Sequence, residues 1–185
     1  MKRSIAFSMV TLFALGAANA VASEADLSLA LVRIGGPISS LYDAYPGFYS
    51  HRLAGGEVLY EVCNQKTLDV FTFTEEPWSR GYVTKIWVRR APVSTCRDET
   101  GALPDVPRPA ATPRGLAIGD PESRVRKIYG EPTQIIRYPS QQTLLYDFAS
   151  TDPKVVKVSL AVTVAGGEVK DFLLSASIAG TAVPK

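Results

Sequence analysis

The chain has 185 residues, of which 46% are hydrophobic and 21% are charged. Lys2 and Arg3 account for the whole excess of 20 basic over 18 acidic side chains, so the rest of the chain is electrically balanced. Without a net positive field, nucleic-acid binding is excluded as a main function. The length fits one domain with a sizeable core, or two small units that share one.

Residues 1–20 have the order of a secretory signal peptide. Lys2 and Arg3 precede an apolar run from Ile5 to Ala18, and Ala18-Asn19-Ala20 completes the pattern. The apolar run is too short for a spanning helix, which makes a membrane anchor the weaker alternative. We expect cleavage after Ala20, or alternatively after Ala22. The mature protein is then periplasmic or secreted, with no integral membrane segment.

Residues 21–90 predict a helix followed by strands. Pro37, Leu41 and Tyr45 mark the start and the buried side of the helix, and Pro46-Gly47 ends it. Segments of alternating character with turn residues between them follow the helix. They predict four strands, at Phe48–Leu53, Glu57–Cys63, Thr67–Thr74 and Tyr82–Arg90.

Residues 91–114 are rich in proline and predict a linker. The chain has two cysteines, Cys63 and Cys96. In an oxidising compartment such a pair most simply forms one disulfide, which contributes roughly 3 to 4 kcal/mol for a loop of this size. It would tie the linker back to the preceding unit. The alternative, a reactive or metal-binding pair, lacks both a CxxC spacing and nearby histidines.

Residues 115–185 predict a second unit of the same kind. Asp120 can cap a helix whose first position is Pro121 and whose end is Gly130. The segments that follow it predict four more strands, at Thr133–Tyr138, Thr143–Ala149, Lys154–Val164 and Glu168–Ile178.

The two units also match each other in sequence. Ile34–Tyr45 and Ile118–Tyr129 share Ile, Gly, Pro, Ser and Tyr at corresponding positions, which indicates an internal duplication. The predicted fold class is therefore α+β. It is a tandem repeat of one helix plus four antiparallel strands, giving an eight-stranded sheet with helices on one face.

The run Ile118-Gly119-Asp120-Pro121, then Val125, then Tyr129-Gly130-Glu131-Pro132, resembles the helical motif of a known group of proteins. The group contains β-lactamase inhibitory protein and the small outer-membrane-assembly lipoproteins of the SmpA/OmlA type. The tandem layout is also similar to that of the inhibitor, although Pro46-Gly47 departs from the motif in the first unit. The resemblance implies binding of another protein rather than conversion of a small molecule, and it transfers no individual functional residue.

Strand alternation divides the predicted sheet into two faces. We expect Tyr60, Val62, Val70, Ile86 and Val88 to point inward, with Tyr146, Phe148, Val156, Phe172 and Leu174 as their counterparts in the second unit. In the second unit the outward set is Asp147, Lys157, Ser159, Asp171 and Ser175, apart from Leu173, and it has the composition of an ordinary solvated face. The outward set of the first unit is then Glu61, Phe71, Phe73, Lys85, Trp87 and Arg89. Aromatic residues rimmed by charges are typical of a protein-contact surface.

Two questions about this surface stay open in the sequence. The linker could fold across the face and bury Phe71, Phe73 and Trp87, or it could leave them exposed. Trp78, in the turn after the third strand, is a further candidate anchor for a partner, unless it folds back on the sheet. The candidate partner-binding residues are Phe71, Phe73, Trp78, Lys85, Trp87 and Arg89.

The sequence argues against catalysis. His51 is the only histidine, and both thiols are expected to be used in a disulfide, so a His-based metal site or a nucleophile–His pair is not predicted. Glu61 and Asp147 occupy corresponding positions in the two units and are the remaining candidate pair of acid–base carboxylates. We expect no catalytic residues, no metal and no cofactor.

The function expected from the sequence is that of a non-catalytic, periplasmic or secreted protein-binding module. Its sharpest form is an inhibitor of a hydrolase, or an immunity protein against one. The alternative is a structural factor that helps to assemble or maintain the bacterial envelope. The identity of the partner protein is not encoded in any motif of the chain.

Overall fold

A computed structural model gives the fold. It describes residues 28–47, 49–53, 55–92, 96–98, 101–103, 105–106, 110–150 and 152–179. The predicted signal peptide lies outside these residues, as do Phe48 and Pro104, Pro107 and Pro109 of the predicted linker.

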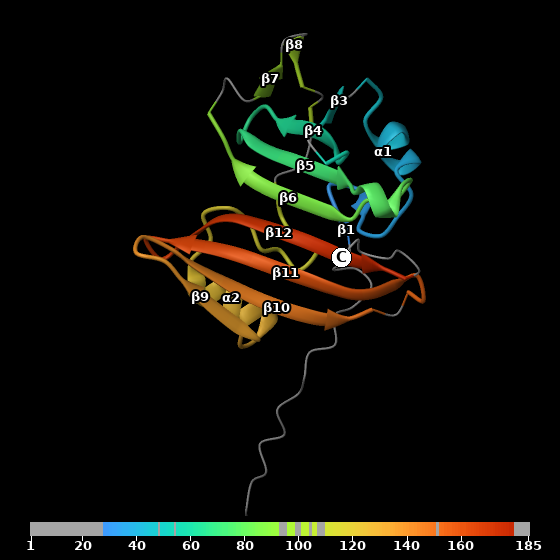
Figure 1. Cartoon of the computed structure of the whole chain (residues 1–185). Helices are drawn as coiled ribbons and strands as arrows, with labels where there is room; N and C mark the ends of the chain where they lie inside the picture. Colours follow the sequence, from blue (N-terminus) through green and yellow to red (C-terminus); the bar gives the residue numbers. More distant parts are fainter. Residues whose placement is uncertain are drawn as a thin grey trace, which may run out of the picture.

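The centre of the fold is one antiparallel sheet with the strand order β3-β4-β5-β6-β12-β11-β10-β9 (Figure 1). Its strands are β3 Tyr49–Arg52, β4 Val58–Asn64, β5 Asp69–Glu75, β6 Lys85–Arg90, β9 Gln134–Arg137, β10 Gln142–Ala149, β11 Val155–Ala165 and β12 Glu168–Ile178. Each overlaps a strand expected from alternation, so the positions of these strands are confirmed. The pairing of β6 with β12, from Arg89↔Asp171 to Lys85↔Ser175, joins the two halves of the chain.

Two short α-helices pack on this sheet. Helix α1 is Ser39–Ala44 and α2 is Glu122–Tyr129. Helix α2 ends at Gly130, whose φ of 80° suits glycine. The start of α2 differs from the prediction. Pro121, not Asp120, is the N-cap residue, and the Asp120 carboxylate instead accepts a hydrogen bond of 2.8 Å from the Ala117 N–H.

Backbone hydrogen bonds attach both helices to the sheet in the same manner. Before α1, the Gly35 N–H donates to the Val83 carbonyl at 2.7 Å. Before α2, the Gly119 N–H donates to the Val169 carbonyl at 2.8 Å. These bonds hold the segment before α1 against the residues that lead into β6, and the segment before α2 against the start of β12. They stabilise helices that are too short to be stable alone.

The expected fold class, an α+β tandem repeat, is corrected by the structure. The described residues are mostly β, and their α-helices have only six and eight residues, whereas β11 and β12 each have eleven. Two additional two-stranded sheets were not predicted. They are formed by β1 Ser28–Leu29 with β2 Val32–Arg33, and by β7 Arg97–Asp98 with β8 Gly101–Ala102.

The hydrophobic core lies between the sheet and both helices. A single cross-strand row runs through Tyr60, Phe73, Ile86, Leu174, Leu160 and Tyr146. All six are buried in the same core cluster, which also contains Leu41 of α1 and Val125 of α2. The ring of Tyr45 lies 6.5 Å from that of Phe73, and the ring of Tyr129 lies 5.6 Å from that of Tyr146. Both helices therefore cover the same face and leave the opposite face as the candidate site.

Candidate functional site

The face of the sheet opposite the helices is defined by the alternation of the strands. Its central cross-strand row is Glu61, Thr72, Trp87, Leu173, Ala161 and Leu145. These side chains alternate along each strand with the buried row described above, so they must point away from the helices. We call this surface the open face.

A hollow of about 640 Å³ lies on the open face. Its lining residues come from β4, β5, β6, β10, β11 and β12 and from the segment between β3 and β4: Leu53, Glu57, Leu59, Glu61, Thr72, Thr74, Lys85, Trp87, Arg89, Thr143, Ala161, Thr163, Asp171 and Leu173. Trp87 and Leu53 stay 40% and 44% exposed, respectively. The hollow is large enough to receive side chains of a partner.

Trp87 is held in position by charged neighbours. The Arg89 guanidinium lies over the indole ring, 5.0 Å from its centroid, in a cation–π arrangement. On the other side, the indole Nε1–H donates a long hydrogen bond of 3.5 Å to Asp171. The exposed ring is therefore fixed before any partner arrives, which lowers the entropy that binding must overcome.

Arg89 also connects Trp87 to strand β4. Its guanidinium lies 3.8 Å from the Glu61 carboxylate, and Glu61 accepts a hydrogen bond of 2.9 Å from the Thr72 hydroxyl. The Nε of Arg89 is buried, and no described residue accepts a hydrogen bond from it. The Arg89 guanidinium therefore pairs with Glu61 but leaves one of its N–H donors unused among the described residues.

Lys85 closes one end of the open face. Its ammonium lies 2.5 Å from Glu76 and 3.6 Å from Glu57. Burial lowers the pKa of Lys85, but the hydrogen bond and the charge of Glu76, with help from Glu57, outweigh this effect and raise its pKa above the usual value. Lys85 therefore stays protonated, and the carboxylates of Glu76 and Glu57 balance its charge.

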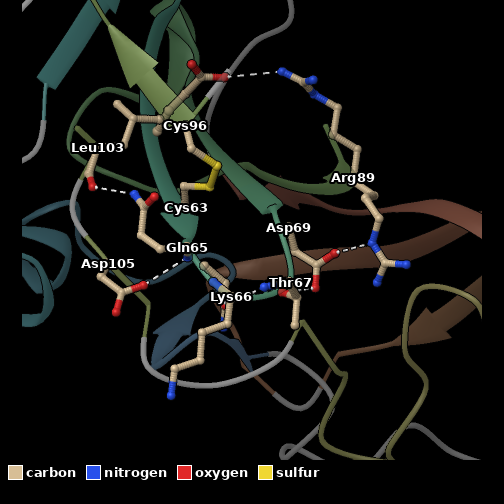
Figure 2. The surroundings of a disulfide bond; sticks show 12 residues. Cys63, Gln65, Lys66, Thr67, Asp69, Arg89, Cys96, Leu103 and Asp105 are labelled. Atoms are coloured by element: carbon tan, nitrogen blue, oxygen red, sulfur yellow. Dashed lines mark hydrogen bonds and ion pairs between the residues drawn. A yellow bond between two sulfur atoms is a disulfide. The ribbon is translucent and has the colours of Figure 1, made fainter. Parts of the chain in front are cut away.

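The Cys63–Cys96 disulfide lies at the opposite end of the open face from Lys85, and Figure 2 shows its surroundings. Cys63 and Val70 stand in one cross-strand row with Arg89, and both are buried beneath Cys96, Ala91 and Leu103. Two hydrogen bonds from Gln65 hold Leu103 and Asp105 of the segment that packs on Cys63 and Val70. Its backbone N–H donates to Asp105 at 3.0 Å, and its amide donates to the Leu103 carbonyl at 3.2 Å. The disulfide Cys63–Cys96 is present as predicted.

Two of the predicted site residues lie on the other face of the sheet. Phe71 and Phe73 are 1% and 0% exposed and belong to the core beneath the helices, so the expectation that they face outward is wrong. The reason is a shift of one residue in β5, because Val70 and not Phe71 shares the face of Trp87. Among the described residues of the linker, Ala91, Cys96 and Leu103 pack on Cys63 and Val70 of this face, and Trp87 stays 40% exposed.

The other predicted site residues divide into two places. Lys85, Trp87 and Arg89 line the hollow together. Trp78 lies in a 3-10 turn, Pro77–Ser79, and lines a separate hollow of about 300 Å³ that reaches Ser175–Ile178 of β12. Lys85 lines both hollows, so Trp78 is a neighbour of the open face and not part of its floor.

Sequence reasoning missed the part of the site that β12 and β11 supply. It described the outward residues of these strands as an ordinary solvated face, with Leu173 as an exception. The pairing of β6 with β12 places Leu173 directly opposite Trp87, and Ala161 lies beyond it. The apolar Leu173 among polar outward positions was the available signal.

The carboxylates Glu61 and Asp147 do not form a catalytic pair. They lie on β4 and β10, which are separated by the four strands β5, β6, β12 and β11. Adjacent strands are about 4.8 Å apart, so the two strands lie on the order of 20 Å from each other, beyond the separation of paired glycosidase carboxylates. Asp147 is moreover paired with Lys157 at 2.9 Å.

Metal sites and membrane-spanning helices are two further features considered for the described residues. In the described part of the chain, no group of three or more His, Cys, Asp or Glu residues could hold a metal ion. None of the helices in the same residues has the length and apolar character needed to cross a bilayer.

Comparisons with protein-family models, with curated proteins and with solved structures find no match to this chain. The resemblance of its helical motif to the β-lactamase-inhibitory-protein and SmpA/OmlA group therefore stays a prediction from the sequence.

Proposed function

We propose that the protein is a non-catalytic binding module of the periplasm or of the secreted fraction, and that it holds another protein on its open face. The observation that carries this proposal is Trp87. A tryptophan that is 40% exposed at the centre of a 640 Å³ hollow is the kind of residue that dominates binding energy in protein interfaces.

The surroundings of Trp87 support the same proposal. Leu53, Leu59 and Leu173 add apolar surface, and charged residues stand at both ends of the hollow. Apolar centres with polar rims are typical of protein-contact surfaces. The disulfide and the predicted signal peptide agree with an oxidising compartment.

The sharpest form of the proposal is an inhibitor of, or an immunity protein against, an envelope or foreign hydrolase. A structural role in envelope assembly or maintenance is the alternative. The two differ in what the open face holds: an inhibitor takes one soluble enzyme, whereas an assembly factor takes a component of a membrane complex.

A comparison of three baits tests the proposal. The wild-type protein, the Trp87→Ala variant and the Tyr138→Ala variant are each incubated with envelope extract. Tyr138 is the control because it is an exposed aromatic residue that does not line the open-face hollow. We expect one protein to be retained in equal amounts by wild type and Tyr138→Ala and to be lost with Trp87→Ala.

The function of the retained protein then separates the two forms. If it is a hydrolase whose activity falls to zero at one equivalent of added bait, the inhibitor form stands. If it is part of a membrane complex and keeps its activity, the assembly form stands. Equal retention by all three baits would contradict binding through the open face.

A further inference from the structure

The charges that line the open-face hollow do not cancel. Five lining residues are charged: Glu57, Glu61, Lys85, Arg89 and Asp171. Lys85 is paired with Glu57, and Arg89 is paired with Glu61. Asp171 is the carboxylate left over, and it has no cationic partner among the described residues.

Asp171 has no ion-pair partner in the described part of the chain, although a cation lies opposite it. Arg89 is its direct neighbour in the β6–β12 ladder. The Arg89 side chain extends the other way, over the ring of Trp87 and toward Glu61. From the described side chains, Asp171 accepts one long hydrogen bond of 3.5 Å, from the Trp87 indole, which a stronger donor would displace.

Further acceptors continue from Asp171 across the floor. Thr163 lies opposite Asp171 on β11, and Thr143 lies opposite Thr163 on β10. Both threonines line the hollow and are half-buried. A carboxylate followed by two hydroxyl oxygens in one row offers acceptors to a ligand with several N–H donors.

The adjacent row offers an apolar surface of matching length. Leu173 and Ala161 stand one row nearer to the centre of the face, on the same two strands as Asp171 and Thr163. A side chain that lay across both rows would contact methyl groups with its stem and oxygen atoms with its tip. An arginine has this shape, because three methylene groups precede a planar fork of five N–H donors.

We propose that the open face receives an arginine side chain of the partner protein, with the guanidinium on Asp171 and Thr163 and the stem on Leu173 and Ala161. This inference rests on the proposed function, because it names the chemistry of the partner at the same surface. The occupant is a protein loop with an arginine at its tip, which the acidic surplus of the hollow favours over an acidic or a neutral loop.

A phage-displayed library of random peptides tests the inference without knowledge of the natural partner. Peptides are selected on the wild-type protein after depletion on Trp87→Ala, so that only open-face binders remain. We expect the selected peptides to share an arginine. Replacing it with glutamine should lower affinity by about tenfold or more, because a charge-assisted hydrogen-bond pair is lost.

The partner side chain and Asp171 are then linked by a double-mutant cycle. Asp171→Asn should weaken the arginine peptide to the level of its glutamine counterpart, and on that variant the arginine-to-glutamine change should have little further effect. Asp147→Asn is the matched control, because Asp147 lies outside the hollow and already has Lys157 and Ser159 as partners. It should leave the affinity unchanged.

The outcomes separate this inference from the proposed function. Selected peptides that need Trp87 but share no arginine, or that bind Asp171→Asn as tightly as wild type, would overturn the arginine site and leave the open face as a binding surface. A selection that returns no peptide dependent on Trp87 would overturn both. Unfolding curves of Asp171→Asn and Trp87→Ala are the check that each variant is folded.

Discussion

Arg89 stands directly opposite Asp171 in the ladder between β6 and β12, yet its guanidinium lies 3.8 Å from Glu61, two strands away on the other side. The Arg89 guanidinium lies over the indole ring of Trp87, and the indole N–H points to Asp171, so the stacking favours the pairing of Arg89 with Glu61. Arg89 thus has two carboxylates within reach and pairs with Glu61. Asp171, which it leaves unpaired, is the proposed binding site for the partner's arginine.

Removal of the Glu61 charge should redirect Arg89. In Glu61→Gln, Asp171 is the carboxylate that remains beside Arg89 among the described residues, so we expect Arg89 to compete with an incoming arginine. A partly exposed ion pair is worth up to about 1 kcal/mol, so affinity for the arginine peptides should fall by up to about fivefold. Isothermal titration measures the change, and Glu61→Gln combined with Arg89→Leu should restore it. Unchanged affinity in Glu61→Gln would contradict the competition.

Phe73 and Trp87 should differ sharply in their effect on stability. Phe73 is fully buried, and its truncation to alanine should lower the free energy of unfolding by about 3 to 5 kcal/mol. Trp87→Ala removes a side chain that is 40% exposed and should cost about 1 kcal/mol or less. Urea denaturation measures both. A large loss for Trp87→Ala would mean that the residue serves the fold and not a partner.

This contrast also shows what the sequence could predict. Alternation located every strand of the main sheet, because polar and apolar residues change places regularly along β4 and β6. It failed in β5, where all seven residues are buried and where Val70 and Phe71 are adjacent apolar residues. Thr72 and Thr74, which alternate with Phe71 and Phe73, carried the correct phase.

A second failure lies in β11. Val156 was expected to point inward and is 67% exposed. The register between β11 and β12 shifts between Val155 and Lys157, so Val156 is an extra residue in a β-bulge. The sequence alone does not reveal such an insertion, since Val155 and Val156 are identical. Nor does it reveal that β6 pairs with β12, the contact that brings Asp171 and Leu173 to Trp87.

Glu75 should contribute stability that depends on pH. Burial raises the pKa of this carboxyl, but the Gly81 N–H at 3.0 Å, the Tyr60 hydroxyl at 2.8 Å and Arg80 outweigh it, and the net pKa is lowered. A lowered folded-state pKa means that the contribution is complete above the usual glutamate pKa and disappears as the pH falls through the folded value. Glu75→Gln should therefore be less stable than wild type at pH 7, by about 1 to 3 kcal/mol.

The difference between the two proteins should shrink as the medium becomes more acidic. Urea denaturation curves collected from pH 7 down to acidic pH measure it. Glu168→Gln is a suitable control, because Glu168 is exposed and pairs only with Lys170 at the surface. A gap between wild type and Glu75→Gln that stayed constant with pH would show that the charge of Glu75 is not the cause.

The disulfide should stabilise the end of the open face. Cys63 and Cys96 are 33 residues apart, and the chain-entropy estimate for such a loop is roughly 3 to 4 kcal/mol. The double variant Cys63→Ala with Cys96→Ala should lose about this amount in urea denaturation. Reducing agent should destabilise the wild-type protein by a similar amount and leave the double variant unaffected. Wild-type unfolding that did not respond to reduction would contradict a stabilising bridge.

Side-chain NMR of the bound protein shows which face of the sheet the partner occupies. Backbone signals report on both faces of a strand, whereas the Trp87 indole N–H and the methyl groups of Leu59 and Leu173 belong to the open face alone. We expect a partner retained by the wild-type bait, or a selected peptide, to shift these signals and to leave the methyl groups of Leu41 and Val125, which lie on the helix side, unchanged. Shifts confined to the helix side, with the Trp87 indole unmoved, would contradict binding on the open face.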